Sequence, residues 1–210
     1  MATTQAAGRG PRRFLSIGWT VANVVAGAAS GAFFAGAYPA NILASTKYGA
    51  VAGGLHLALA LFGAWMATGV AFWSAHWLVL HERFSLSRSW LAIAPLVGLG
   101  FMATQFLINI WSQWLIGSAA ICVAAAGAGW IIGALQWMLM REPDVSANRW
   151  VAATAAGAAV AALIWFPGFP WAVSHINVIL GGAIAGGFYG IPGALVLMTG
   201  VRGRQPQLVA

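Results

Sequence analysis

Charged side chains are scarce in this 210-residue chain. Asp, Glu, Lys and Arg make up 6% of its residues, whereas about a quarter is usual in soluble globular proteins. Hydrophobic residues make up 61%, and the mean hydropathy is +0.83. This composition excludes an ordinary soluble domain and predicts a protein of the lipid bilayer.

Acidic residues and cysteines are scarcer still. The three acidic residues are Glu82, Glu142 and Asp144, and none falls in the interior of a long apolar run. Carboxylates inside a membrane mark the proton and cation pathways of pumps and transporters, so those classes are disfavoured. The single Cys122 excludes an intramolecular disulfide. No cysteine or carboxylate completes a zinc site with the histidines, and no metal site is predicted.

Long apolar runs are abundant. A run of about 20 residues crosses the hydrocarbon core of a bilayer as a helix, and six runs of this kind can be identified. They span residues 14–38, 50–81, 88–110, 115–141, 148–166 and 175–200. We therefore expect an all-α integral membrane protein with six transmembrane helices arranged as three helical hairpins. Residues 14–200 form one domain, between short polar tails at residues 1–13 and 201–210.

The basic residues predict the orientation of these helices. Nine of the ten flank the runs on the side of the two termini, and only Lys47 falls in the first connection, on the other side. Basic residues in short loops stay cytoplasmic, so both termini should be cytoplasmic in a cell inner membrane, with Lys47 outside. The net charge of +7 is then a topology signal. Nucleic-acid binding is disfavoured because the basic residues are dispersed over short loops.

Tryptophan and arginine side chains near the cytoplasmic ends of the runs are expected to anchor the helices at the lipid headgroups. The expected anchors are Trp77, Trp90, Trp137, Trp150, Arg83, Arg88, Arg141 and Arg149.

An internal repeat is predicted at an offset of 60 residues. Residues 69–92 align without a gap with residues 129–152, and His76 falls on Gln136. The identical pairs are Gly69 with Gly129, Trp77 with Trp137, Glu82 with Glu142, Trp90 with Trp150, and Ala92 with Ala152. Each unit is the end of one helix, a short cytoplasmic turn and a second helix that begins near a tryptophan. The units run in the same direction, which is a parallel repeat.

The stretch "GALQWMLMRE" (133–142), followed by "NRWVAATAAGAA", resembles a recurring Gln-Trp-x-x-Leu-Arg unit in a loose group of uncharacterised bacterial polytopic membrane proteins. In that group a tryptophan opens the next helix. The resemblance covers residues 129–157 well and residues 69–100 in part. His76 and His81 depart from the pattern. The resemblance implies the hairpin architecture and no particular activity.

Small residues spaced four apart predict close helix packing, because they let two backbones approach. The expected packing residues are Gly27, Gly31, Gly129, Gly133, Gly157, Gly182, Gly186 and Gly190. These faces can pack against one another, which a six-helix bundle requires, or against helices of other membrane subunits or a second copy.

Uncharged polar and aromatic residues toward the outer half form a candidate ligand pocket for a small amphipathic molecule. Its expected members are His56, Gln105, Asn109, Trp111, Gln113, Trp114, Trp165, Trp171, His175 and Asn177. The alternative is a belt of residues at the headgroup boundary with hydrogen-bonded helix ends.

No catalytic residue is predicted. The stretch "GAASG" (27–31) superficially resembles the serine motif of intramembrane rhomboid proteases, but Ala28 stands where that motif needs glycine. Ser30 is expected to pack between helices instead.

Three functions remain open. The first is a non-enzymatic scaffold or accessory subunit that packs against other membrane helices. The second is a binding or transport protein for a small neutral or amphipathic compound. The third is a haem- or chlorophyll-type pigment subunit that uses His56 or His175. No cofactor is required by the first two.

Overall fold

The computed structural model describes residues 12–84, 86–111, 118–140, 145–168 and 175–199. Within these ranges, some helical residues are described by their backbone only. They are residues 12–13, 38–54, 57, 82–83, 89, 104–111, 118, 120, 166–168 and 175–176.

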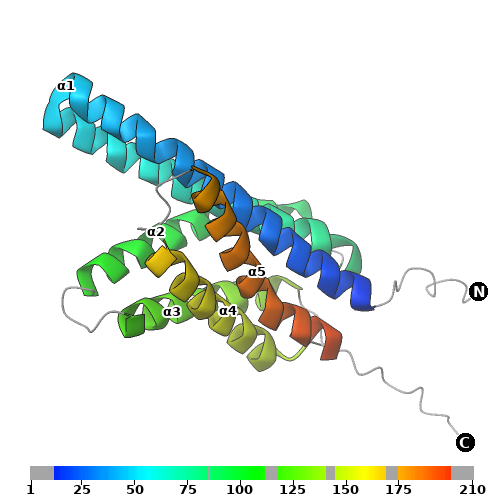
Figure 1. The fold of residues 1–210 in the computed structure, drawn as a ribbon. Helices are drawn as coiled ribbons and strands as arrows, with labels where there is room; N and C mark the ends of the chain where they lie inside the picture. Colours follow the sequence, from blue (N-terminus) through cyan, green and yellow to red (C-terminus); the bar gives the residue numbers. More distant parts are fainter. Residues whose placement is uncertain (1–11, 85, 112–117, 141–144, 169–174, 200–210) are drawn as a thin grey trace, which may run out of the picture.

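Apart from residues 86–87 and 145–146, the described part of the chain is helical, and it contains no strand (Figure 1). Its elements are α1 (Arg12–Phe84), the 3₁₀ helix η1 (Arg88–Ile93), α2 (Ala94–Trp111), α3 (Ser118–Met140), α4 (Ala147–Gly168) and α5 (His175–Thr199).

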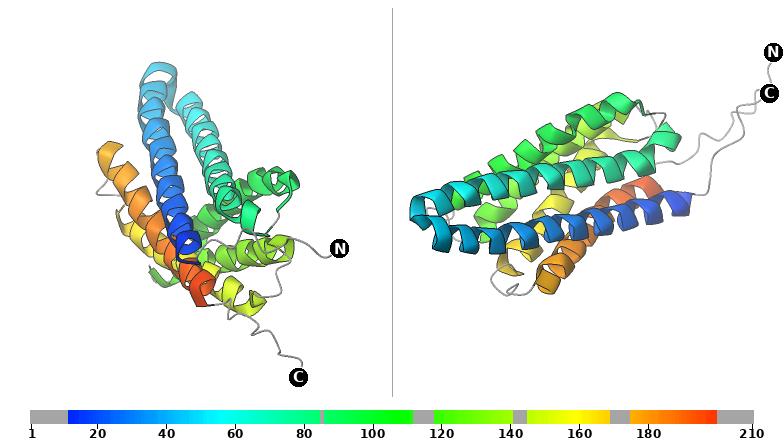
Figure 2. Two further views of the ribbon diagram at one scale, coloured as in Figure 1. Left: turned by 90° about the vertical axis from the view of Figure 1, so that its right-hand side faces the viewer. Right: turned by 90° about the horizontal axis from the view of Figure 1, so that it is seen from above.

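Helix α1 reverses direction along its length. Its helical assignment is continuous over 73 residues, yet His76 lies within hydrogen-bonding distance, 2.9 Å, of Asn23. A straight helix would separate residues 53 positions apart by about 80 Å. The two arms of α1 run side by side in both views of Figure 2. We call residues 14–37 the N-terminal arm and residues 58–81 the C-terminal arm.

Within the described ranges, five stretches of helix are long and apolar enough to cross a membrane. They are Phe14–Ala37, Ala58–His81, Ile121–Met140, Ala147–Trp165 and Asn177–Thr199. Each corresponds to one of the six runs expected from the sequence. The remaining run coincides with η1 and α2, in which residues Trp90–Ala103 form a shorter apolar helical stretch. The expected all-helical architecture is therefore found, and these five segments have the length and composition that a membrane-spanning helix needs.

The helices close into a ring. The N-terminal arm of α1 packs against α5, α5 against α4, α4 against α3, α3 against α2, and α2 against the C-terminal arm of α1. The hydrogen bond between His76 and Asn23 joins the two arms of α1 and so closes the ring of helices. This arrangement places one central space between all the helices.

All eight expected packing glycines are buried at contacts between helices of this chain. A methyl group added to Gly27 would strike the backbone of Gly182 and Gly186 on α5. A methyl group added to Gly157 on α4 would strike the carbonyl oxygen of Tyr189. The helices approach so closely that backbone meets backbone, which only glycine permits at these positions.

Two of the helix contacts have matching residue positions. Gly69 in α1 faces Ala94 and Gly98 in α2. Gly129 in α3 faces Thr154 and Ala158 in α4. Each member of the second set lies 60 positions after its counterpart in the first.

A hydrophobic core lies at the end of the bundle where α1 begins and α5 ends. It contains buried residues from both arms of α1, from η1 and from α2 to α5. Trp73 and Trp90 stack within it, with ring centroids 4.6 Å apart. A smaller cluster, built on Phe34 and Val178, lies toward the other end.

Candidate functional site

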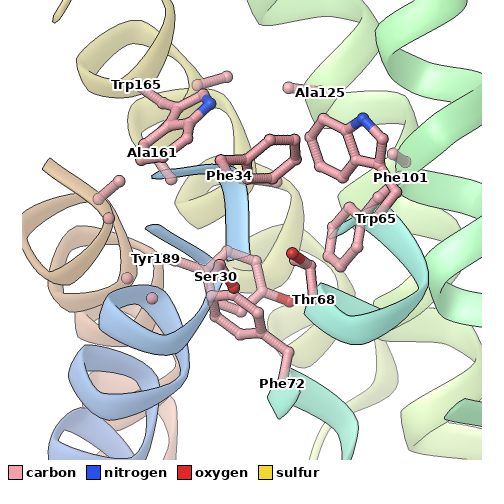
Figure 3. Close-up of a pocket in the computed structure, with 17 residues that line it drawn as sticks. Ser30, Phe34, Trp65, Thr68, Phe72, Phe101, Ala125, Ala161, Trp165 and Tyr189 are labelled. Atoms are coloured by element: carbon pink, nitrogen blue, oxygen red, sulfur yellow. The ribbon is translucent and has the colours of Figure 1, made fainter. Parts of the chain in front are cut away.

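A pocket of about 130 Å³ lies in the centre of the ring (Figure 3). Both arms of α1 and all of α2 to α5 contribute to its wall. The wall consists almost entirely of glycine, alanine and aromatic side chains, and is partly open. Its lining residues are Gly27, Ser30, Phe34, Trp65, Thr68, Phe72, Phe101, Ala125, Ala128, Ala158, Ala161, Ala162, Trp165, Gly182, Ala185, Gly186 and Tyr189.

Three hydroxyl groups supply the polar part of this wall. They belong to Ser30 on the N-terminal arm, Thr68 on the C-terminal arm and Tyr189 on α5. All three residues are at least nine-tenths buried, and they lie on the same side of the pocket, near Phe72 (Figure 3). Trp165 lies on the opposite side. The pocket is thus apolar at one end and hydroxyl-lined at the other.

The protons of two of these hydroxyls already have acceptors. Ser30 Oγ donates to the carbonyl oxygen of Ala26 at 2.8 Å. Thr68 Oγ1 donates to the carbonyl oxygen of Ala64, also at 2.8 Å. Such bonds to the preceding helical turn are usual for serine and threonine in apolar helices. Within the described part of the chain, no hydrogen bond to the Tyr189 hydroxyl is found.

Beyond the hydroxyl end of the pocket lies a chain of buried hydrogen bonds with a single direction. An indole N–H can only donate, so Trp150 Nε1 donates to Gln136 Oε1 at 3.2 Å. Gln136 Nε2 then donates to Nδ1 of His76 at 2.8 Å. His76 Nε2 donates to Asn23 Oδ1 at 2.9 Å, and Asn23 Nδ2 donates to the carbonyl oxygen of Trp19 at 2.8 Å.

This direction defines the state of the histidine. Because Nδ1 of His76 accepts a hydrogen bond from Gln136, it carries a lone pair, and the ring is neutral with its proton on Nε2. The side chains of Asn23, His76, Gln136 and Trp150 are at most 1% exposed. They satisfy one another across both arms of α1, α3 and α4, which offsets the cost of burying polar groups in an apolar interior.

Aromatic rings join this chain to the pocket. The ring of His76 stacks on Trp19, with centroids 4.2 Å apart and planes at 21°. The centroid of the His76 ring also lies 6.0 Å from that of Tyr189 and 6.1 Å from that of Phe72. Since Tyr189 and Phe72 also line the pocket, the buried chain and the pocket share a wall.

Three of the residues expected for a ligand site have side chains that the structure describes. Trp165 lines the pocket, whereas His56 and Asn177 are exposed and do not. The other expected members lie outside the residues whose side chains the structure describes. They are Gln105, Asn109, Trp111, Gln113, Trp114, Trp171 and His175.

The expected headgroup anchors separate into two groups. Trp90 and Trp150 are 2% and 0% exposed, so core packing accounts for these two residues, in place of the headgroup contact expected from the sequence. Trp77 and Trp137 are half-buried, and Arg88 and Arg149 are exposed. The side chains of Arg83 and Arg141 lie outside the described residues.

Sequence reasoning did not single out most residues of the pocket and the buried chain. Asn23, Thr68 and Tyr189 carried no spacing signal, whereas Ala125 and Ala161 lie four residues from Gly129 and Gly157. A usable signal existed for His76, which the repeat aligns with Gln136. Two polar residues at equivalent positions of apolar helices are expected to find partners inside the bundle, and here they bond to each other.

Among the described residues, no group of three or more His, Cys, Asp or Glu side chains could hold a metal ion. Comparison of the chain with family models, curated proteins and solved structures finds no match.

Proposed function

We propose that this protein crosses the membrane six times and binds a small, largely apolar molecule in the central pocket. The observation that carries this proposal is the pocket itself, which is built from every long helix of the ring and has a polar end. A protein cavity of about 150 Å³ lined by apolar side chains stays dry and binds benzene. The pocket of about 130 Å³ therefore suits a single ring or a short branched chain.

Binding is favoured over passage through the bundle. On one side of the pocket, the centre of the ring is filled by the buried chain from Trp150 to Asn23 and by the stacked rings of Trp19 and His76. The tryptophan-rich core lies at the same end. A molecule in the pocket would have to break this chain to reach the end where α1 begins.

A scaffold function receives less support from the structure. The glycines expected to offer faces to partner helices are occupied by contacts within the chain. A pigment function is also less favoured, since none of the described lining residues is a histidine. The pocket volume is also close to that of a benzene site, which is too small for a macrocycle. Co-purification of a partner subunit or a coloured cofactor would favour these alternatives.

Filling the pocket should abolish binding. Ala161 on α4 lines the pocket, and an Ala161→Phe substitution places a ring in the space that the ligand needs. We expect saturable binding of 4-fluorotoluene by the wild-type protein in lipid nanodiscs, measured by ¹⁹F NMR. The affinity of the variant for 4-fluorotoluene should be at least tenfold lower. The matched control is Ala156→Phe, on the exposed face of the same helix. Equal binding by the two variants would contradict the proposal.

We propose that both termini are cytoplasmic. The beginning of α1 and the end of α5 lie at the same end of the bundle (Figure 1), and the pattern of basic residues assigns that end to the cytoplasm. In a Cys122→Ser background, a Lys47→Cys variant should react with a membrane-impermeant maleimide in intact cells. A Ser146→Cys variant, at an exposed position before α4, should react only after permeabilisation. The reverse pattern would invert the topology.

A further inference from the structure

The hydroxyl groups at one end of the pocket indicate which polar group a ligand would carry. This inference rests on the proposed function of the pocket as a binding site. A serine or threonine hydroxyl has one proton and two lone pairs. Ser30 and Thr68 give their protons to the carbonyl oxygens of Ala26 and Ala64. These two oxygens can therefore still accept hydrogen bonds from a ligand.

Tyr189 complements them. Its phenolic group both donates and accepts, it is 7% exposed, and no partner for its hydroxyl is found in the described ranges. Leaving a hydroxyl group without a hydrogen-bond partner in apolar surroundings costs free energy. A bound molecule that accepts from Tyr189 would recover part of this free energy.

We propose that the pocket selects a neutral molecule whose polar group is a hydroxyl, such as a small phenol or alcohol. A hydroxyl can donate to Ser30 or Thr68 and accept from Tyr189 at the same time. An ether or ketone can only accept, so it would place its oxygen against two acceptor oxygens. A hydrocarbon would make no hydrogen bond to the Tyr189 hydroxyl or to the acceptor lone pairs of Ser30 and Thr68.

The remaining wall limits the ligand to an uncharged species. Apart from these hydroxyl groups, the lining residues are alanine, glycine, phenylalanine and tryptophan, and none carries a charge. Burying an unpaired ion in such surroundings is strongly unfavourable. Carboxylates, ammonium compounds and phosphorylated molecules are accordingly excluded, and the ring of the ligand lies toward Phe34, Trp65 and Trp165.

Three probes of nearly the same shape test this selectivity. They are 4-fluorophenol, with a donor and acceptor; 4-fluoroanisole, with an acceptor only; and 4-fluorotoluene, with neither. Binding to the full-length protein in nanodiscs is measured by ¹⁹F NMR, with each affinity corrected for partition of the probe into empty nanodiscs. We expect 4-fluorophenol to bind at least fivefold more tightly than either of the other two.

Variants then assign the preference to the three hydroxyls. Thr68→Val keeps the shape of the side chain and removes the acceptor, and Tyr189→Phe removes the donor. Each should reduce the preference for 4-fluorophenol over 4-fluorotoluene at least threefold, with 4-fluorotoluene binding unchanged. Thr154→Val is the matched control, because this buried threonine bonds to the carbonyl oxygen of Trp150 and does not line the pocket.

The possible failures are distinct. If no probe binds saturably, the proposed function of the pocket is overturned. If all three probes bind with equal affinity, the pocket is a binding site, and the hydroxyl selectivity is overturned. Equal binding of 4-fluorophenol and 4-fluoroanisole would overturn the requirement for a donor, as would a preference that survives in the Ser30→Ala/Thr68→Val double variant.

Discussion

Replacing Gly27 with alanine is expected to destabilise the protein by about 1–3 kcal/mol or more, the range for overpacking a tight interior. The new methyl group would strike the carbonyl oxygen of Gly182 and lie 3.0 Å from the Cα atom of Gly186. Both neighbours are backbone atoms, so no side chain can rotate away. The N-terminal arm of α1 and α5 would have to move apart.

Gly36→Ala is the matched control, because it makes the same change on the same arm. Gly36 is exposed, and a methyl group added to it meets no atom within 4 Å. The control should be neutral, or stabilising by up to about 1 kcal/mol through helix propensity. Stability is measured for both variants by unfolding with increasing mole fraction of SDS in mixed micelles. Equal stability of the two variants would contradict the close approach of α1 and α5.

Replacing Gln136 with leucine is expected to destabilise the bundle by about 2–6 kcal/mol, because two buried groups lose their partners. The change leaves Trp150 Nε1 without an acceptor and His76 Nδ1 without a donor. Each buried group that loses its partner costs about 1–3 kcal/mol. Because the chain has one direction, no rotation of a remaining side chain restores both hydrogen bonds.

A double-mutant cycle tests whether His76 and Gln136 act together. The free energies of unfolding of His76→Leu, Gln136→Leu and the double variant are measured in the same mixed micelles. Direct bonding at 2.8 Å should make the double variant less destabilised than the sum of the single variants, by about 0.5–3 kcal/mol. Additive effects would show that the bond contributes nothing measurable to stability.

These predictions concern a bundle whose interior differs in character from that of a soluble protein. Large apolar side chains such as Leu78, Trp130 and Leu180 are more than half exposed, whereas glycines and alanines line the helix contacts. Lipid tails are as apolar as leucine, so burying leucine between helices gains little. Close backbone approach and satisfied polar groups are left to stabilise the contacts.

The repeat stays a prediction from the sequence, and the positions that it aligns lie at matching helix contacts. Gly69 meets Ala94 and Gly98 as Gly129 meets Thr154 and Ala158, and His76 bonds to its aligned counterpart Gln136. We infer that the C-terminal arm of α1 with α2, and α3 with α4, are two copies of one helix pair. Their aligned polar positions then meet near the centre of the ring.

The amino-acid sequence by itself was sufficient to predict an all-helical chain with long apolar segments. The length of an apolar run depends on local composition, and so do the positions of small residues four apart. Five expected runs correspond to helices of sufficient length. The eight expected packing glycines lie at helix contacts, because their spacing places them on one face of a helix wherever that helix packs.

The tertiary structure alone decided which face of each helix points inward. In a soluble protein, the alternation of polar and apolar residues along a helix indicates its buried face. Here both faces are apolar, so the pattern does not indicate which face is buried. Of the three expected ligand residues whose side chains the structure describes, Trp165 lines the pocket, and His56 and Asn177 face outward. The pocket requires the rotation of six helical segments about their axes to be set together, and no single segment encodes that rotation.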